Sequence, residues 1–467
     1  MFTLGDLWEG ITGEKLEHPL ALEFKNGVID SRLAEKGSLF VALRGEDGDG
    51  HDYVKDAFER GALAALVERE IEGYPLARVK DPSSFPSSPE PFCLLVEDSL
   101  RALQDLAAYW RRKFDLRVIG VTGSTGKTTT KETIWSVLRK AFTTLKSEAN
   151  YNNEIGLPLT LLNLDESYQK VILEMGMYDL GEIARLAEIS QPQVGVITNV
   201  SHSHLERLKT LARIAQAKAE LVEALPSNGV AILNGDEPRV KAIAQKTEAK
   251  VFFYGLSPDC DLWASDIESR GLQGVHFNLH HGEETLHVRI PLLGRHSVHA
   301  ALAAAAVGLV EGEPWDQIIA GLQDIAAQLR LIAVPGIKGS TIIDDTYNAS
   351  PASTLAALNL LADLEGRKIA VLGDMLELGS FEEKGHRLVG RRAAETVDKL
   401  VTVGPRGRII AQEAQALGMD EDALFAVESN QEAVEVLRRL IASGDLILLK
   451  GSRGMKMEEI VAELGGN

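Results

Sequence analysis

A single stretch of sequence, residues 117–138, constrains the fold more than any other. Its letters, RVIGVTGSTGKTTTKETIWSVL, read as a buried strand, a glycine-rich turn and a helix. The backbone amides of such a turn, with the positive end of the helix that follows, form a cradle for phosphate groups. Lys127 would neutralise the terminal phosphates of a nucleotide, and the Thr128 hydroxyl would hold a magnesium ion. The pattern therefore predicts an ATP site made of Gly123, Ser124, Thr125, Gly126, Lys127, Thr128 and Thr129.

The spacing of this turn departs from the common GxxxxGK[ST] pattern. Val121 occupies the first glycine position, and Gly120 lies one residue earlier. A phosphate loop alone is compatible with kinases, GTPases, motors and ligases, so the reaction has to be inferred from other residues.

Short apolar runs alternate with helix-like segments along most of the chain, which predicts parallel sheets covered by helices. One series contains RVIGVTG, KVILEM and VGVITNV; a second contains TIIDD, KIAVLGD, KLVTVG and DLILLKG. Residues 77–92 concentrate Pro and Ser, a composition typical of a loop or linker. With 467 residues, at roughly 100–200 residues per domain, we expect three α/β domains: 1–98, a central parallel-sheet domain 99–328, and a Rossmann-like, doubly wound domain 329–467.

Composition excludes several classes of protein. The net charge is -19, with 49 basic and 68 acidic residues, which argues against general affinity for nucleic acid or anionic membranes. No signal-peptide pattern and no run of about 18 apolar residues occurs. The two cysteines, Cys93 and Cys260, lie far apart without metal-ligand spacing. We therefore expect a cytoplasmic protein with no nucleic-acid partner and no membrane insertion.

Polar residues follow the predicted strands at the edge where ligands of open α/β sheets bind. Glu174 ends the KVILEM strand, where its carboxylate can bind magnesium directly or through water. His204 follows the next strand and could ligate a divalent ion, although a surface or capping role explains it equally well. His202 is the weaker candidate, because a shift of one residue in a turn can reverse the direction of a side chain.

Lys218 interrupts an apolar helix face. Helical spacing puts it on one stripe with Leu211, Ala215, Val222 and Leu225, a stripe that should be buried. Its long stem could carry the ammonium group out to water. Alternatively, burial could lower the pKa of the amine by as much as ~3–5 units, leaving a nucleophile that reacts with carbon dioxide. The carbamate formed would be a negatively charged metal ligand.

At this point the motifs resemble those of the Mur ligase family, in order and over nearly the whole chain. They are TGSTGKTTTKE, NYNNEIGLPLTLL, LEMG, SHLE followed by AKAE, GRH before an Ala-rich helix, DDTYNASP, VLGDMLELG and LLKGSRGMKME. The N-terminal DSR and GSLFVALRGEDGDGHDYV segments resemble the uridine-nucleotide domain of that family. DDTYNASP and GDMLELG resemble the branch whose substrates are UDP-N-acetylmuramoyl-tripeptide and D-alanyl-D-alanine. The resemblance implies ATP-driven formation of a carbon–nitrogen bond through an acyl phosphate.

The resemblance also implies roles for particular residues. Lys127, Glu174, His204 and Lys218 would be catalytic, with Thr128 and Glu174 holding one Mg²⁺ and His204 with a carbamylated Lys218 holding a second. Further contacts are implied for ATP with Arg330, Asp345 and Asn348; for the uridine nucleotide with Ser31 and Arg32; for the reacting carboxylate with Asn152 and Asn153; and for the dipeptide with Lys450, Ser452 and Arg453.

Some of these residues have plainer interpretations when taken singly. Asn152 and Asn153 are common turn formers, and Ser31 with Arg32 could be a capped surface turn. After the GRH histidine the family usually carries two asparagines, and this chain has Ser297 and His299 as the polar residues of that segment. His299 could replace an amide as a hydrogen-bond partner of the nucleotide base.

Three rival functions remain. A sister Mur ligase would add a different amino acid, and we expect it to lack the DDTYNASP and GDMLELG pair. A phosphotransferase would use the loop at 120–128 and form ADP without releasing phosphate. A degenerate nucleotide-binding module would not be expected to retain Lys127, Glu174 and Lys218. We expect a monomer; the sequence leaves open whether the third peptide residue is lysine or diaminopimelate.

Overall fold

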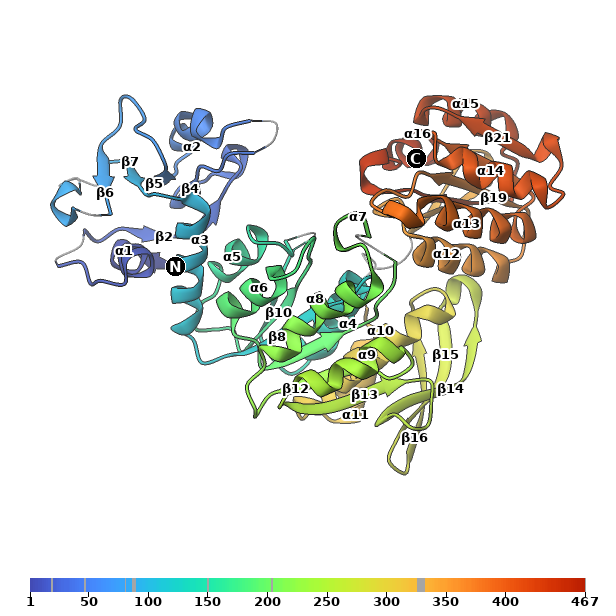
Figure 1. Cartoon of the computed structure of the whole chain (residues 1–467), viewed down its shortest axis with the longest axis horizontal. Coiled ribbons are helices and arrows are strands. Elements are labelled where there is room, and N and C mark those ends of the chain that lie inside the picture. The colour runs from blue at the N-terminus through green and yellow to red at the C-terminus, as the bar shows by residue number, and fades with distance from the viewer. Residues whose placement is uncertain are drawn as a thin grey trace.

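A computed structural model describes residues 1–17, 20–45, 48–79, 81–85, 90–148, 151–202, 205–325 and 332–466. Three lobes follow one another along the chain, and Figure 1 shows the central lobe between the N-terminal lobe, in blue, and the C-terminal lobe, in red. Each lobe contains a sheet that is mainly parallel, with helices against it, so the predicted three-part α/β fold is confirmed. No helix among these residues is both long and apolar enough to span a bilayer.

The N-terminal lobe holds a five-stranded parallel sheet, in the order β3-β4-β5-β7-β6. Its elements are β1 (Phe2–Thr3), α1 (Leu4–Thr12), β2 (Glu23–Phe24), β3 (Asn26–Val28), β4 (Ser38–Val41), α2 (Val54–Glu59), β5 (Ala64–Val67), β6 (Leu76–Arg78) and β7 (Phe92–Leu95). The Pro/Ser segment 77–92 connects β6 to β7, which pair in this sheet. Of the loop and the linker that its composition allows, the loop is therefore confirmed.

The central lobe is built on a nine-stranded sheet, in the order β16-β15-β14-β13-β12-β11-β8-β10-β9. Its strands are β8 (Arg117–Thr122), β9 (Thr144–Lys146), β10 (Lys170–Glu174), β11 (Val194–Ile197), β12 (Val230–Asn234), β13 (Lys250–Gly255), β14 (Leu262–Ser269), β15 (Val275–His281) and β16 (Glu284–Ile290). Its helices are α3 (Ser99–Arg112), α4 (Lys127–Leu138), α5 (Gly156–Leu161), α6 (Glu182–Ser190), α7 (Leu205–Leu208), α8 (Leu211–Glu223), α9 (Pro238–Ile243), α10 (Val298–Val310) and α11 (Trp315–Gln323). Strands β8 to β14 all run parallel to one another. Strands β15 and β16 are added antiparallel at the edge next to β14.

The C-terminal lobe has a six-stranded sheet, in the order β17-β18-β22-β19-β20-β21, in which only the pair β17–β18 is antiparallel among the described strands. Its strands are β17 (Ile332–Pro335), β18 (Thr341–Asp344), β19 (Lys368–Gly373), β20 (Lys399–Val403), β21 (Leu424–Val427) and β22 (Leu446–Lys450). Its helices are α12 (Pro351–Asp363), α13 (Glu382–Thr396), α14 (Gly407–Ala416), α15 (Asn430–Leu440) and α16 (Glu458–Leu464).

Strand β8 lies inside the central sheet and is buried on both faces. Because side chains alternate along a strand, Val118 packs into one hydrophobic core while Ile119 and Val121 pack into another on the opposite face. The first core continues through α3 into the N-terminal lobe, and the Trp110 indole donates a hydrogen bond to the Leu164 carbonyl at 3.1 Å. The phosphate-loop strand is thus fixed on both sides, and the N-terminal lobe shares part of that core.

Candidate active site

The glycine-rich loop after β8 is held by the end of the neighbouring strand β11. Asn199 closes it, since its carbonyl accepts from Ser124 N and its Oδ1 accepts from Thr125 N, each at 3.0 Å. At Gly123 an added Cβ would lie 1.8 Å from Thr198 Oγ1, so this position admits only glycine. Gly126 adopts a left-handed conformation (φ 77°) at the start of α4, the geometry that turns the amides of the loop toward a bound anion.

Glu174, at the end of β10, faces this loop from the other side. Its Oε2 accepts a hydrogen bond from Thr128 Oγ1 and its Oε1 accepts one from Asn152 Nδ2, both at 2.8 Å. The residue is only 2% exposed, so the carboxylate is fixed. One carboxylate beside one hydroxyl fits a magnesium ion that takes its other ligands from water and phosphate. Within the described ranges no group of three or more His, Cys, Asp or Glu side chains forms a ready metal cage.

Two lysines lie near the loop, Lys127 half-buried and Lys218 buried. Lys127 donates to the Gly123 carbonyl at 3.0 Å, and burial lowers the pKa of its amine while Glu174 opposes that shift. Lys218 is 1% exposed in the middle of α8, so its stem does not carry the amine to water and the predicted burial is confirmed. Burial, reinforced by the charge of Lys127, lowers the pKa of Lys218 well below its ordinary value. No hydrogen bond or ion pair joins Lys218 to any residue in the described part of the chain.

A cleft of about 1050 Å³ opens between the central and C-terminal lobes. The phosphate loop and Glu174 line one wall, and the segments after β18 and β22 line the other. The cleft brings together the predicted residues Ser124, Thr125, Gly126, Lys127, Thr128, Thr129, Asn152, Asn153, Glu174, Asp345, Asn348, Lys450, Ser452 and Arg453. The volume of the cleft and its mixture of polar and apolar lining residues are those of a small-molecule site.

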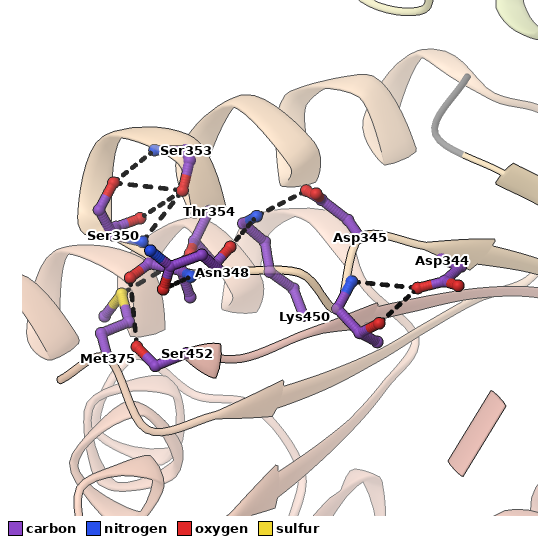
Figure 2. Close-up of polar contacts among 11 residues, drawn as sticks. Asp344, Asp345, Asn348, Ser350, Ser353, Thr354, Met375, Lys450 and Ser452 are labelled. Atoms are coloured by element: carbon purple, nitrogen blue, oxygen red, sulfur yellow. Dashed lines mark hydrogen bonds and ion pairs between the residues drawn. The ribbon is translucent and has the colours of Figure 1, made fainter. Parts of the chain in front are cut away.

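On the C-terminal wall, Lys450 holds two predicted residues together. Its Nζ lies 2.7 Å from Asp345 Oδ2 and donates to the Asn348 carbonyl at 2.8 Å, as Figure 2 shows. Burial raises the pKa of Asp345, and the Lys450 ammonium opposes that rise. Ser452 accepts from Leu376 N at 2.8 Å, which ties the loop after β22 to the loop after β19. Arg453 lies over the ring of Tyr347, 5.6 Å from its centroid.

Ser31 and Arg32 lie away from the cleft, whereas Asn153 lines it. Ser31 and Arg32 form a short 3-10 turn in the N-terminal lobe, where Asp30 accepts from the Arg32 backbone and guanidinium at 2.9 Å. His204 and Arg330 lie outside the described residues. Asn153 accepts from Gly156 N at 2.9 Å, the turn-forming contact that its residue type predicts.

Sequence reasoning missed Lys131, one helical turn after Lys127 on α4. This fully buried side chain donates to the Ser147 carbonyl at 2.7 Å and lies 3.3 Å from Glu132 and 4.0 Å from Glu174. The Ser147 hydroxyl in turn accepts a hydrogen bond from the Glu174 amide at 3.1 Å. Lys131 therefore helps to hold Glu174 in place through Ser147. The available signal was its spacing of four residues from Lys127, which puts both lysines on one helix face.

Family models match all three lobes of the chain. The model described as "Mur ligase family, catalytic domain" matches residues 24–110, "Mur ligase middle domain" matches 121–308, and "Mur ligase, glutamate ligase domain" matches 329–453. Among curated proteins, UDP-N-acetylmuramoyl-tripeptide--D-alanyl-D-alanine ligase of Bacillus subtilis is 39% identical over 93% of this chain and 92% of its own length. The enzyme of that name from Escherichia coli is 35% identical over 100% of this chain and 98% of its own.

Solved structures resemble the whole chain as well. MurF from Acinetobacter baumannii superposes with a TM-score of 0.83 at 31% identity, covering 99% of this chain and 98% of that chain. MurF ligase from Thermotoga maritima in complex with ADP gives a TM-score of 0.78 at 28% identity, covering 95% and 98%. The chain matches three domain models of one family and relatives along nearly their full length, and its phosphate loop lies in a cleft between two lobes. The chain therefore belongs to the Mur ligase family.

Proposed function

We propose that this protein joins the terminal carboxylate of UDP-N-acetylmuramoyl-tripeptide to the amine of D-alanyl-D-alanine, with conversion of ATP to ADP and phosphate. Two relatives that carry this activity in their names are 39% and 35% identical over 93% and 100% of the chain. One observation carries the proposal most directly: the cleft puts the phosphate loop and Glu174 opposite Asp345 and Lys450 of the other lobe. The product would be the pentapeptide precursor of peptidoglycan.

The chemistry proceeds in two steps. A carboxylate oxygen of the tripeptide attacks the γ-phosphorus, ADP leaves, and an acyl phosphate forms. The amine of the dipeptide then attacks the acyl carbon, loses a proton, and expels phosphate from the tetrahedral intermediate. Lys127, part of a preformed anion site, stabilises charge on the transferred phosphoryl group, and Asn152 orients the reacting carboxylate.

We assign charge neutralisation to Mg²⁺, and the paired Thr128 hydroxyl and Glu174 carboxylate fit one such ion. Thr128 and Glu174 would hold one Mg²⁺ on the phosphates, and a second would lie between His204 and a carbamate on Lys218. For the carbamate, the neutral Lys218 amine adds to the carbon of CO₂ and loses one proton. Deep burial and the neighbouring charge of Lys127 favour that neutral amine.

Further assignments follow the same proposal. Asp345, Asn348 and Arg330 would contact ATP from the C-terminal lobe, and Ser31 and Arg32 would contact the uridine diphosphate. Asn153 would accompany Asn152, and Lys450, Ser452 and Arg453 would hold the dipeptide. We further propose domain limits of 1–98, 99–328 and 329–467, and a monomer that works in the cytoplasm.

The test is phosphate release from ATP and Mg²⁺ in the presence of both substrates, with each substrate also omitted in turn. We expect release only when both are present, and near-complete loss in a Lys127→Ala variant. ADP formation without free phosphate would indicate a phosphotransferase. Release that proceeds without D-alanyl-D-alanine, or requires another amino acid, would indicate a sister ligase.

A further inference from the structure

An exposed aromatic ring lies beside the place proposed for the reacting carboxylate. Asn152, which would orient that carboxylate, is tied to the segment after β10, because the Gly176 amide donates to the Asn152 carbonyl at 2.7 Å. Further along this segment, Tyr178 lines the cleft and is 49% exposed. An exposed ring in a cleft is a surface that a ligand can cover. Because the third residue of the tripeptide carries the reacting carboxylate, its side chain can extend along this wall.

Arg207 lies over the ring of Tyr178. Its guanidinium carbon is 5.6 Å from the ring centroid, within the range of a cation–π contact. The arginine is exposed, and no ion pair joins it to a carboxylate in the part of the chain that the structure describes. The neighbouring Leu208 is fully buried in the core, and the Glu206 amide donates to the Glu377 carbonyl of the C-terminal lobe at 3.4 Å. The short helix α7 is therefore fixed on both sides of Arg207, whose charge is available to an anion.

Glu182 supplies the opposite charge on the same wall. It lies in the first turn of α6, lines the cleft, and its Oε2 accepts a hydrogen bond from the Tyr178 amide at 2.7 Å. Its Oε1 has no hydrogen-bond partner among the described residues. Tyr178 thus contacts a guanidinium through its ring and a carboxylate through its amide. One cation and one anion beside an exposed ring are complementary to a group that carries both a carboxylate and an ammonium.

The two candidate third residues differ at the end of the side chain. Diaminopimelate ends in a carbon that carries an ammonium and a carboxylate, whereas lysine ends in an ammonium alone. An arginine without a counter-charge attracts the additional carboxylate and repels an ammonium that lacks one. The nearby Arg213 does not offer the same contact, because its guanidinium already lies 4.0 Å from the Asp179 carboxylate.

We propose that Arg207 is the specificity-determining residue for the third position of the tripeptide. Stacked on Tyr178, it binds the distal carboxylate of diaminopimelate and so selects that peptide over the lysine peptide. Glu182 binds the ammonium that both peptides carry. The inference rests on the proposed ligase activity, and it names the third residue that the cleft prefers.

The test compares UDP-N-acetylmuramoyl-tripeptides that end in diaminopimelate or in lysine, by kcat/KM for phosphate release at saturating ATP and D-alanyl-D-alanine. We expect the wild-type protein to prefer the diaminopimelate peptide about tenfold or more, as a charge-assisted contact allows. Arg207→Met keeps an apolar stem over the ring without the charge. In this variant the KM for the diaminopimelate peptide should rise until the preference is within about twofold, while the KM for ATP and the turnover of the lysine peptide stay the same. Arg213→Met is the matched control, a nearby arginine that is already paired, and should keep the full preference.

Glu182→Gln gives a second measurement. The amide oxygen can still accept from the Tyr178 amide, but the negative charge is lost. Because both peptides carry the ammonium, kcat/KM should fall by a similar factor for both, and the preference for diaminopimelate should remain.

Each outcome decides the matter. Equal use of the two peptides by the wild-type protein, or a preference for lysine, would overturn the inference and leave the ligase proposal intact. A preference that survives in Arg207→Met, or an equal loss for both peptides in that variant, would also overturn it. Loss of the preference in Glu182→Gln would place the selection on Glu182 instead. Absence of phosphate release with either peptide would contradict the proposed ligase activity itself, and the inference with it.

Discussion

Two lysines of the central lobe are almost equally inaccessible to water, yet their surroundings differ. Lys131 lies among oxygens: the Ser147 carbonyl at 2.7 Å and the carboxylates of Glu132 and Glu174. Lys218 lies on the apolar face of α8 without such a partner among the described residues, and the charge of Lys127 repels it. Removing one partner of a buried ion pair is strongly destabilising, because the other charge is left uncompensated. A buried amine without counter-charges is instead driven to the neutral, nucleophilic form. The comparison assigns support of Glu174 to Lys131 and supports the proposed reactivity of Lys218.

The largest effect should appear in the activity of Lys218→Met. Methionine fills a similar volume without the amine, so we expect turnover to fall about 100-fold or more, as loss of a metal ligand does. The melting temperature should stay the same or rise, because a buried unpaired polar group is removed. Steady-state phosphate release and thermal unfolding measure the two quantities. Normal turnover in this variant would remove the basis for a carbamate.

Lys131→Met should lower the stability of the fold, whereas Lys218→Met should not. Removal of the cation leaves Glu174 without its ion-pair partner, while Lys146 still pairs with Glu132. We expect a cost of about 3 kcal/mol, the lower end of what breaking a buried pair costs. Chemical unfolding measures this free energy. Lys140→Met is the control, because its pair with Asp324 is partly exposed and its loss should cost no more than about 1 kcal/mol. Equal effects of the two substitutions would contradict the structural role of Lys131.

Withdrawal of carbon dioxide tests the reactivity of Lys218 without a mutation. In buffer freed of CO₂ we expect activity to fall several-fold and to recover when bicarbonate is added, because carbamate formation is reversible. With ¹³C-labelled bicarbonate, the wild-type protein should give a carbamate resonance that Lys218→Met lacks. A resonance present in both proteins would place the modification on another amine.

The smallest effect concerns a buried acid. Both carboxylate oxygens of Glu313 are buried without hydrogen-bond partners among the described residues, and burial raises the pKa to about 7 from 4.5. Below pH 4.5 Glu313 is protonated in both the folded and the unfolded state, and its contribution to the free energy of unfolding is complete. That contribution is lost as the pH rises through about 7. Glu313→Gln should therefore be more stable than wild type at pH 8, by about 1–3 kcal/mol, with little difference at pH 5. A difference that does not change with pH would show that Glu313 does not titrate in this range.

The sequence predicts features that depend on local pattern. The three-part α/β fold, the strand-turn-helix at 117–138 and the burial of Lys218 all follow from periodicity and residue type. Contacts between distant segments do not follow, because they depend on strand order. The pairing of His299 with Asp236 spans 63 residues and requires β12 to end beside the start of α10. Composition alone left the Pro/Ser segment open as a loop or a linker, because it does not show that the strands on either side pair with each other.

The most direct test of the proposed ligase chemistry follows an oxygen atom. The tripeptide substrate is labelled with ¹⁸O in its terminal carboxylate and incubated with ATP, Mg²⁺ and D-alanyl-D-alanine, and the released phosphate and the peptide product are analysed by mass spectrometry. An acyl phosphate carries one carboxylate oxygen into the phosphate, so we predict one ¹⁸O atom per phosphate and a product heavier by the dipeptide less water. Unlabelled phosphate, or release without the heavier product, would contradict it.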